Sequence, residues 1–181
     1  MLGGMSHYAV SAIGRDRPGI VAAISRVLLD LKGNVEDSQM SILRGHFAVM
    51  LIVALPGRAD PRDLERRLVR VREELGLEAI AVSRVDELSE AGPQPSHVLS
   101  VYGADHPGIV HAVSSALAER EISITDLETR LTGSPDAPVY VMLMEIAAAG
   151  ADPGELESAL REIGGREGLE VSLRELVAEA L

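Results

Sequence analysis

The residues with the clearest chemical potential lie in one short motif that the chain contains twice. Residues 14–21 read GRDRPGIV and residues 103–110 read GADHPGIV, so six of eight positions are identical at a separation of 89 residues. Each copy joins a predicted strand to a predicted helix, where free backbone N–H groups and the helix dipole attract an anion such as a carboxylate. Gly19 and Gly108 lack a Cβ, so a ligand can approach the backbone closely at these positions.

An acidic residue precedes each of these glycines. Asp16 and Asp105 are hydrogen-bond acceptors that could bind an ammonium group next to the carboxylate position at the helix N-terminus. A carboxylate position beside an ammonium position suits an α-amino acid. A purely structural explanation is also available, because Asp in such a turn can cap local N–H groups and glycine can simply permit the turn. The spacing of the residues leaves both interpretations open.

The remaining polar residues form no known catalytic or metal-binding pattern. The chain has no cysteine, and none of its five histidines stands in an HExxH pattern. It also contains no GxSxG elbow, GxGxxG fingerprint or P-loop. We therefore expect no catalytic residue, no metal and no cofactor. His106 lies in the second turn, where it could contact an anionic ligand or could be a solvated loop residue.

The elements that position the two turns follow the same order in both copies. Helices are expected to begin at Pro18 and Pro107, and again at the Asp-Pro steps at 60–61 and 152–153. Gly33 is expected to end the first helix, and Gly164-Gly165 to shorten the last. Alternating or apolar runs predict strands at 7–13, 35–43, 47–55 and 77–85, and at 97–102, 122–131, 139–147 and 169–173.

This strand-helix-strand-strand-helix-strand order predicts an α+β fold. Each copy is expected to be a ferredoxin-like βαββαβ domain, with two helices on one face of an antiparallel sheet. We place domain 1 at residues 5–86, a polar linker rich in Gly and Pro at 87–95, and domain 2 at 96–181.

The apolar run at 47–55, FAVMLIVAL, has apolar residues on both faces of its predicted strand. A sheet covered by helices on one face should instead alternate apolar and polar residues. The second face therefore needs another domain or another subunit, and we expect a homodimer, a tighter assembly or an intramolecular pairing of sheets.

Composition and charge limit the classes of partner. The 181 residues include 28 acidic and 17 basic side chains, for a net charge of -11, which disfavours direct binding to nucleic acid. No basic recognition helix is visible. No apolar run approaches the ~18–20 residues that span a membrane, and the N-terminus does not resemble a signal peptide. With no cysteine in the chain, we expect a cytoplasmic protein.

The paired D-x-P-G-I-V turns resemble those of ACT domains. The segments GNVEDSQM with FAVMLIV, and DHPGIV with ITDLETR and PVYVMLME, are similar to the glycine cleavage system transcriptional repressor family, which has two tandem ACT domains. The resemblance extends from His7 to about Leu173. The D-R-P-G-I-V turn is also similar to the N-terminal region of formyltetrahydrofolate deformylase, but that enzyme's catalytic domain is not found in this sequence.

The resemblance also implies which residues bind an effector. In amino-acid-binding ACT domains the effector lies between two domains and contacts the acidic turn residue, the glycine amide and an Asn that begins the second strand. Asn34 stands in that last position in the first copy and Ser123 in the second, where a shorter side chain with fewer donors alters the site. Asn34 could equally be a turn residue after Gly33. The predicted ligand-binding residues are Asp16, Arg17, Gly19, Ile20 and Asn34, and Asp105, His106, Gly108, Ile109 and Ser123.

The function implied is regulation without catalysis. The chain would sense a small amino acid, glycine or a relative, and act on glycine cleavage genes indirectly through a protein partner such as a transcriptional regulator. Two alternatives stand beside this hypothesis. The chain could be a docking module that regulates a metabolic enzyme without binding a ligand, or a deformylase fragment, which the missing catalytic constellation disfavours.

Overall fold

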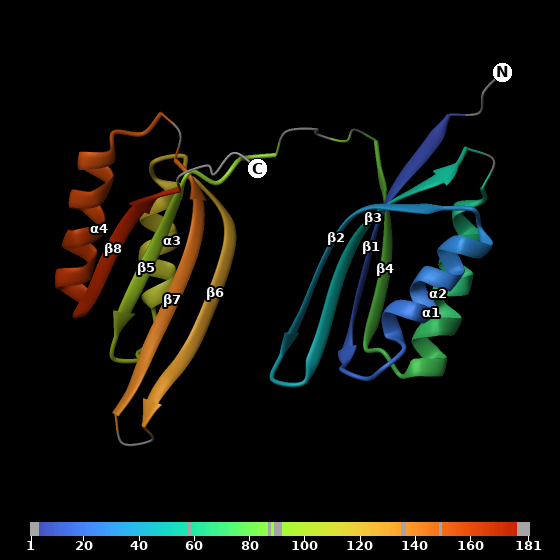
Figure 1. Ribbon diagram of the computed structural model, residues 1–181, viewed down its shortest axis with the longest axis horizontal. Coiled ribbons are helices and arrows are strands. Elements are labelled where there is room, and N and C mark those ends of the chain that lie inside the picture. The colour runs from blue at the N-terminus through green and yellow to red at the C-terminus, as the bar shows by residue number, and fades with distance from the viewer. Residues whose placement is uncertain are drawn as a thin grey trace. The chain divides into compact units, whose positions relative to one another are not determined.

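A computed structural model describes residues 4–57, 59–86, 88, 92–134, 137–148 and 150–176. The chain divides into two compact units, Met1–Ser89 and Glu90–Leu181. Each contains four strands and two helices, shown in chain order in Figure 1. Of the predicted linker, residues 87 and 89–91 lie outside the described residues, and its boundaries stay a prediction.

Unit 1 is a four-stranded antiparallel sheet with two helices. The strand order is β2-β3-β1-β4, so the first strand lies inside the sheet and the second lies at its edge. The elements are β1 (Met5–Arg15), α1 (Ile20–Asp30), β2 (Asn34–Leu43), β3 (His46–Pro56), α2 (Pro61–Leu75) and β4 (Ala79–Val85).

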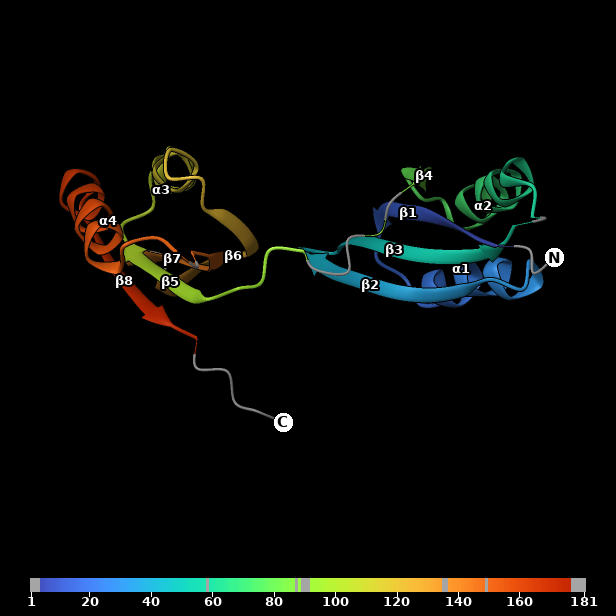
Figure 2. The same ribbon diagram turned by 90° about the horizontal axis from the view of Figure 1, so that it is seen from above.

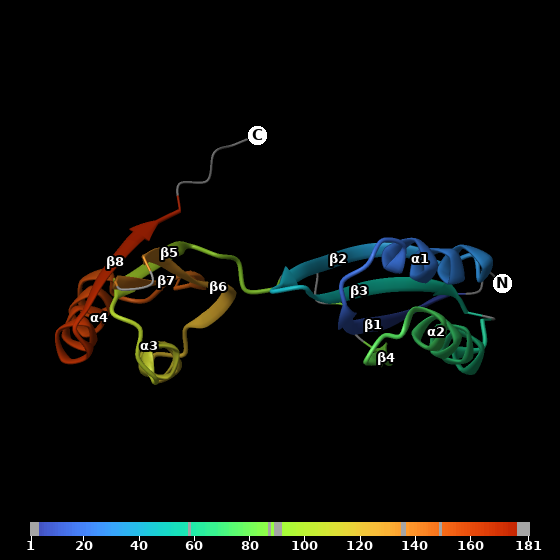
Figure 3. The same cartoon turned by 90° about the horizontal axis from the view of Figure 1, so that it is seen from below.

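Unit 2 repeats this topology, with strand order β6-β7-β5-β8. Its elements are β5 (His97–Gly103), α3 (Ile109–Ala118), β6 (Ser123–Ser134), β7 (Ala137–Ala147), α4 (Pro153–Glu167) and β8 (Leu169–Glu175). In each unit both helices lie on one face of the sheet, as Figure 2 and Figure 3 show from above and below. The predicted ferredoxin-like α+β fold is confirmed.

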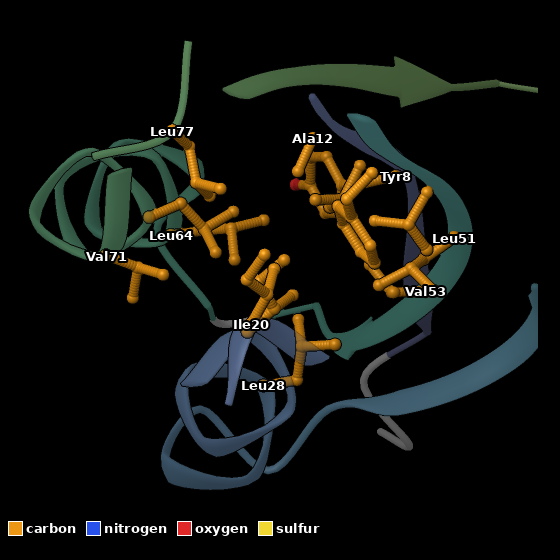
Figure 4. Close-up of a cluster of buried hydrophobic side chains, with 14 of the residues drawn as sticks. Tyr8, Ala12, Ile20, Leu28, Leu51, Val53, Leu64, Val71 and Leu77 are labelled. Carbon is orange, nitrogen blue, oxygen red and sulfur yellow. The ribbon is translucent and has the colours of Figure 1, made fainter. Parts of the chain in front are cut away.

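Each core lies between the helices and the sheet. Along β1 the buried residues alternate, Tyr8, Val10 and Ala12, so one face of the strand is apolar and faces the helices. Figure 4 shows Ile20 from α1 and Leu64 from α2 directed toward the side chains of this face. Unit 2 has an equivalent cluster, to which β7 contributes Met142, Met144 and Ile146.

Both turn prolines precede their helices, which corrects the expected helix starts. The first helix begins at Ile20 and its N-cap is Gly19, with a φ of 99°. That backbone conformation is left-handed, so Gly19 cannot belong to the first helical turn and Pro18 is displaced outside the helix. Gly108, with a φ of 106°, displaces Pro107 in the same way before α3.

α1 ends at Asp30, and the left-handed residue that follows its C-cap is Lys32, which corrects the role predicted for Gly33. Lys32 has a φ of 58°, and the next N–H, that of Gly33, donates to the Leu28 carbonyl at 2.8 Å. This is the 6→1 bond of a Schellman motif, whose left-handed residue is usually glycine. Gly33 is needed for a different reason, because a Cβ there would lie 2.3 Å from Cδ2 of Leu55.

The glycine pair in α4 does not shorten the helix, so that expectation is wrong. The helix continues to Glu167 and has 15 residues, the same length as α2. Gly164 lies where the helix approaches β8, and a Cβ there would be 2.7 Å from the Leu169 carbonyl oxygen. Close packing favours glycine at this position although its helix propensity is low.

The outward face of β3 is only partly buried in the described residues. Phe47 and Val53, on the helix side, are 2% and 0% exposed. On the other side Met50 is 53% exposed, and its neighbour Ile13 on β1 is 47% exposed. The helices of unit 1 do not cover this face, and its burial in an assembly stays a prediction.

Candidate functional site

The two predicted turns have the same backbone geometry. Gly19 and Gly108 are N-caps with φ of 99° and 106° and ψ of -10° and -13°. Because φ is positive, any L residue would be strained at either position. A Cβ built on either glycine would meet nothing within 4 Å, so the space in front of each turn is open.

The helices that follow these turns have uncapped N-termini. No side chain accepts a hydrogen bond at the N-cap of α1 or α3. The other two helices differ, because Asp60 accepts from the Arg62 N–H at 3.0 Å and Asp152 from the Glu155 N–H at 2.9 Å. Asp16 and Asp105 are not the N-cap residues of α1 and α3, and the first N–H groups of these helices are left for another acceptor.

The first turn lies against the hairpin between β2 and β3. The Asp16 N–H donates to the Gly45 carbonyl at 2.9 Å, which brings the exposed Arg44 to the same end of the unit. Arg15 and Arg17, also exposed, flank Asp16 in the chain. Three arginines therefore lie next to Asp16 in the chain or in the adjoining hairpin, and basic residues near the turn favour an anionic ligand there.

Arg17 and its counterpart His106 each lie beside the C-terminal end of the second helix of their unit. A Cβ built on Gly76, the C-cap of α2, would lie 3.8 Å from an Arg17 guanidinium nitrogen. In unit 2, His106 Nε2 lies 3.1 Å from the carbonyl of Glu167, the last residue of α4. A cation is stabilised at a helix C-terminus by the free carbonyl groups and the dipole.

Main-chain carbonyls face both nitrogens of the His106 ring. Nδ1 lies 3.2 Å from the Pro107 carbonyl oxygen, and Nε2 faces the Glu167 carbonyl. Both carbonyls raise the pKa of His106, and that of Pro107 has the larger effect. The charges of Glu167 and Asp105 raise it further. A carbonyl oxygen can only accept, so both bonds form only in the imidazolium form. The ring is held by the main chain, and its contact with a ligand stays a prediction.

Tyr140 lies next to the second turn, although no local pattern in the sequence indicates this. It pairs with Gly103 across the sheet, at the start of the turn, whereas Phe47 pairs with Gly14 in unit 1. Burial raises the pKa of Tyr140, and the charge of Asp105 adds to this effect. The two turns therefore have different walls, one apolar and one with a phenol.

Asn34 and Ser123 are not close to the turn of their own unit. Asn34 begins β2 at the end of α1 that is farthest from Gly19, as Figure 1 shows. The 11 residues of α1 separate the two ends by about 16 Å. Ser123 begins β6 in the same relation to Gly108. Ile20 and Ile109 are each 2% exposed, so they can offer a ligand only their backbone N–H groups.

Gly45 and Gly76 also border the first turn and were not predicted. The two-residue connection Arg44-Gly45 is typical of a β-hairpin turn, and both residues have positive φ as such a turn requires. This pattern could have identified Gly45. No local signal indicates that α2 ends beside Arg17. Within the described ranges, no group of three His, Asp or Glu side chains is placed to hold a metal ion, and no helix is long and apolar enough to span a membrane.

Comparison with known families gives a match for each unit. Residues 7–81 and residues 97–165 match families that are both described as the ACT domain. The chain belongs to the ACT-domain family. It carries two ACT domains in tandem, and the turns described above are the turns of these two domains.

Three relatives show how far the similarity of this tandem ACT protein extends. A UPF0237 protein of Methanopyrus kandleri is 42% identical over 78 residues, 42% of this chain and 86% of the relative. The glycine cleavage system transcriptional repressor of Escherichia coli is 26% identical over 162 residues, 87% of this chain and 84% of the relative. The crystal structure of an unknown protein from Galdieria sulphuraria has a TM-score of 0.80 at 29% identity, covering 96% of this chain and 100% of its own. The protein is thus a regulatory ACT-domain protein related to the repressor and to UPF0237 proteins.

Proposed function

We propose that the protein is a non-catalytic sensor of a small amino acid, glycine or a close relative. The observation that carries this proposal is the uncapped N-terminus of α1, which begins at an open glycine next to an exposed carboxylate, that of Asp16. The free N–H groups and the helix dipole stabilise the effector's carboxylate by ~0.3–1 kcal/mol, and more where water is excluded. The Asp16 carboxylate accepts a hydrogen bond from the effector's ammonium group.

The first turn is the better of the two sites. Arg15 and Arg17 belong to it and Arg44 to the adjoining hairpin, whereas the second turn has His106, whose ring nitrogens already face main-chain carbonyls. Asn34, about 16 Å from the turn of its own unit, serves a turn in another ACT domain or in another subunit. Effector binding then couples to the contact between domains, which a partner can detect.

The output of the sensor is control of transcription through a protein partner. The relative from Escherichia coli is called a transcriptional repressor, and the similarity covers 87% of this chain. The net charge of -11 disfavours direct contact with DNA phosphates, so the partner makes that contact. We also propose that the protein is cytoplasmic and acts as a homodimer, whose second copy supplies the wall that one small domain lacks.

Calorimetric titration of the full chain with glycine, alanine and serine tests the proposal. The wild type is expected to bind at least one of them, and Asp16→Ala to weaken it roughly ten- to a hundredfold, because a charge-assisted hydrogen bond worth ~1.5–3 kcal/mol is lost. Asp105→Ala is the matched control, and it should change affinity much less. Gly19 is a poorer target, since its φ of 99° strains any replacement whether or not a ligand binds.

Two results would contradict this function. Equal affinity in the wild type and both variants would place the site elsewhere. Absence of binding by any amino acid at millimolar concentration would favour the second candidate, a docking module that regulates a metabolic enzyme without an effector. The exposed apolar face around Met50, which offers a surface for a protein, is the observation that favours this second candidate.

A further inference from the structure

Unit 2 contains a cavity at the end of its sheet that lies opposite the DHPGIV turn. Its volume is about 420 Å³, within the range of small-molecule sites, and it is open to solvent on one side. It is bordered by the start of β5, the end of β8 and the first turn of α4, which Figure 1 shows at the same end of the unit. Every residue that lines it belongs to unit 2.

The cavity lies where unit 2 has smaller side chains than unit 1. Tyr8 pairs with Val53 in unit 1, and its counterpart 89 residues later, His97, pairs with Ile146. Two residues beyond these partners stand Leu55 in unit 1 and Ala148 in unit 2. Tyr8 and Leu55 are 4% and 0% exposed and close the core of unit 1, whereas in unit 2 the half-buried His97 and the smaller Ala148, which is 5% exposed, both line the cavity.

The largely apolar wall of the cavity carries four polar side chains, those of Ser96, His97, Glu157 and Glu175. The Ser96 hydroxyl accepts from the Ala148 N–H at 2.8 Å and lies 2.9 Å from His97 Nδ1. Glu175 is the cross-strand partner of His97, and it takes the place that Arg84 has beside Tyr8 in unit 1. Replacement of an arginine by a carboxylate reverses the charge at this end of the sheet.

The charged side chains that line the cavity favour a cationic ligand. Glu157 and Glu175 line the cavity, and neither Lys nor Arg does. Glu157 pairs with Arg161 at 2.7 Å, but that arginine has 70% of its side chain exposed and lies one turn further along α4. Among the described residues, Glu175 makes no ion pair. Ala148 and Leu173 supply apolar contact between the polar groups.

We propose that this cavity binds a small organic cation of the alkylammonium class. The ammonium group lies between the carboxylates of Glu157 and Glu175, with the Ser96 and His97 side chains as further hydrogen-bonding groups. The alkyl part lies against Ala148 and Leu173. This site is separate from the amino-acid turns, because the strand β5 from His97 to Gly103 stands between it and the DHPGIV turn.

Amide NMR titration of the full chain with butylammonium chloride tests the proposal, with sodium butyrate as the anion of matched size. We expect saturable shifts at Ser96, His97 and Glu175 with butylammonium only, at a Kd of about millimolar for so small a ligand. Shifts that fail to saturate by about 100 mM, or equal binding of butyrate, would overturn the proposal.

Two variants separate the cavity from other acidic surfaces. His97→Tyr with Ala148→Leu restores the side chains of unit 1, which the same fold accommodates, and should abolish the shifts. Glu157→Gln with Glu175→Gln should weaken binding about ten- to a hundredfold. Glu65→Gln, at the position of unit 1 that corresponds to Glu157, is the control and should change nothing. The assignment of the site to this cavity would be contradicted if the variant with His97→Tyr and Ala148→Leu bound butylammonium with wild-type affinity while the NMR signals of unit 1 stayed unaltered.

Discussion

Arg17 and His106 occupy equivalent positions, and both place a cationic group at the end of a helix. Arg17 lies beside Gly76 at the end of α2, and His106 reaches the Glu167 carbonyl at the end of α4. The arginine is charged at every physiological pH, whereas the histidine titrates. At the scale of single residues, the second turn is therefore the one that can respond to pH.

The pKa of His106 is raised in the folded protein, chiefly by the Pro107 carbonyl and then by that of Glu167, with Asp105 and Glu167 as the nearby charges. The stabilisation from this contact is therefore complete below the unfolded pKa and is lost as pH rises through the folded pKa. We expect the melting temperature of the wild type to approach that of His106→Gln between about pH 6 and 8.

His106→Arg is the control for this titration, because it places a permanent charge where Arg17 has one. The difference in melting temperature between His106→Arg and His106→Gln should therefore stay constant with pH. A constant difference between the wild type and His106→Gln from acid to alkaline pH would show that the ring acts by packing alone.

At the scale of elements, the four helices begin in two ways. Two have an aspartate cap and two begin at a left-handed glycine without one. Capped N-termini serve stability and uncapped ones leave donors for a ligand. The two domains have the same arrangement. The uncapped helices α1 and α3 follow the glycine turns, and the aspartate-capped helices α2 and α4 follow the third strand of each domain.

Unfolding in urea should separate these two kinds of aspartate. Asp60→Ala and Asp152→Ala are each expected to lower the free energy of unfolding by about 1 kcal/mol, since each removes an N-cap hydrogen bond. Asp16→Ala should lower it much less, because its side chain caps no helix. An equal loss in Asp16→Ala would mean that this residue has a structural role and that its effect on binding is indirect.

The end of α1 gives a second prediction about an element. Lys32 has a φ of 58° and Gly33, the next residue, does not have positive φ. Lys32→Gly is expected to raise the free energy of unfolding by up to about 1 kcal/mol, because a left-handed residue without a Cβ is not strained. Gly33→Ala should lower it, since its Cβ would lie 2.3 Å from Leu55 Cδ2. Denaturant titration measures both, and the opposite order of stabilities would contradict the Schellman geometry.

At the scale of the whole molecule, the outward face of the first sheet has no charged residue at its centre. Ala48 and Ile52 flank Met50 along β3, and its uncharged cross-strand partners are Ser11 on β1 and Gln39 on β2. Unit 2 has Glu145 where unit 1 has Ile52, and an edge aspartate pairs with each of them, Asp126 in unit 2 and Asp37 in unit 1. The first face is therefore the better surface for a second copy of the chain, in keeping with the proposed homodimer.

We expect light scattering to report a dimer for the wild type and a monomer for Met50→Lys, which places a charge in the middle of this face. Leu29→Lys is the control, because Leu29 is 65% exposed on α1, away from the sheet, and should leave the dimer intact. A monomeric wild type, or a dimer unchanged by Met50→Lys, would contradict assembly through this face.

Much of the fold follows from patterns that lie close together in the sequence. The repeat at 89 residues, the apolar faces of the helices and the Asp-Pro starts at Asp60 and Asp152 could all be read from neighbouring positions. Helix caps and hydrophobic periodicity are local properties, so the chain by itself determined the order of elements and the α+β class. The errors at Pro18, Gly33 and Gly164 arose where backbone dihedrals or close packing overrode a residue's usual preference.

Which side chains and backbone groups come into contact depends on the three-dimensional fold. His106 and the Glu167 carbonyl are 61 residues apart in sequence, and the 11 residues of α1 hold Asn34 about 16 Å from the turn of its own unit. The cavity at His97 and Ala148 depends on the register of three strands and one helix. Such contacts depend on sheet order and register, which bring distant segments together, and no window of neighbouring residues encodes them.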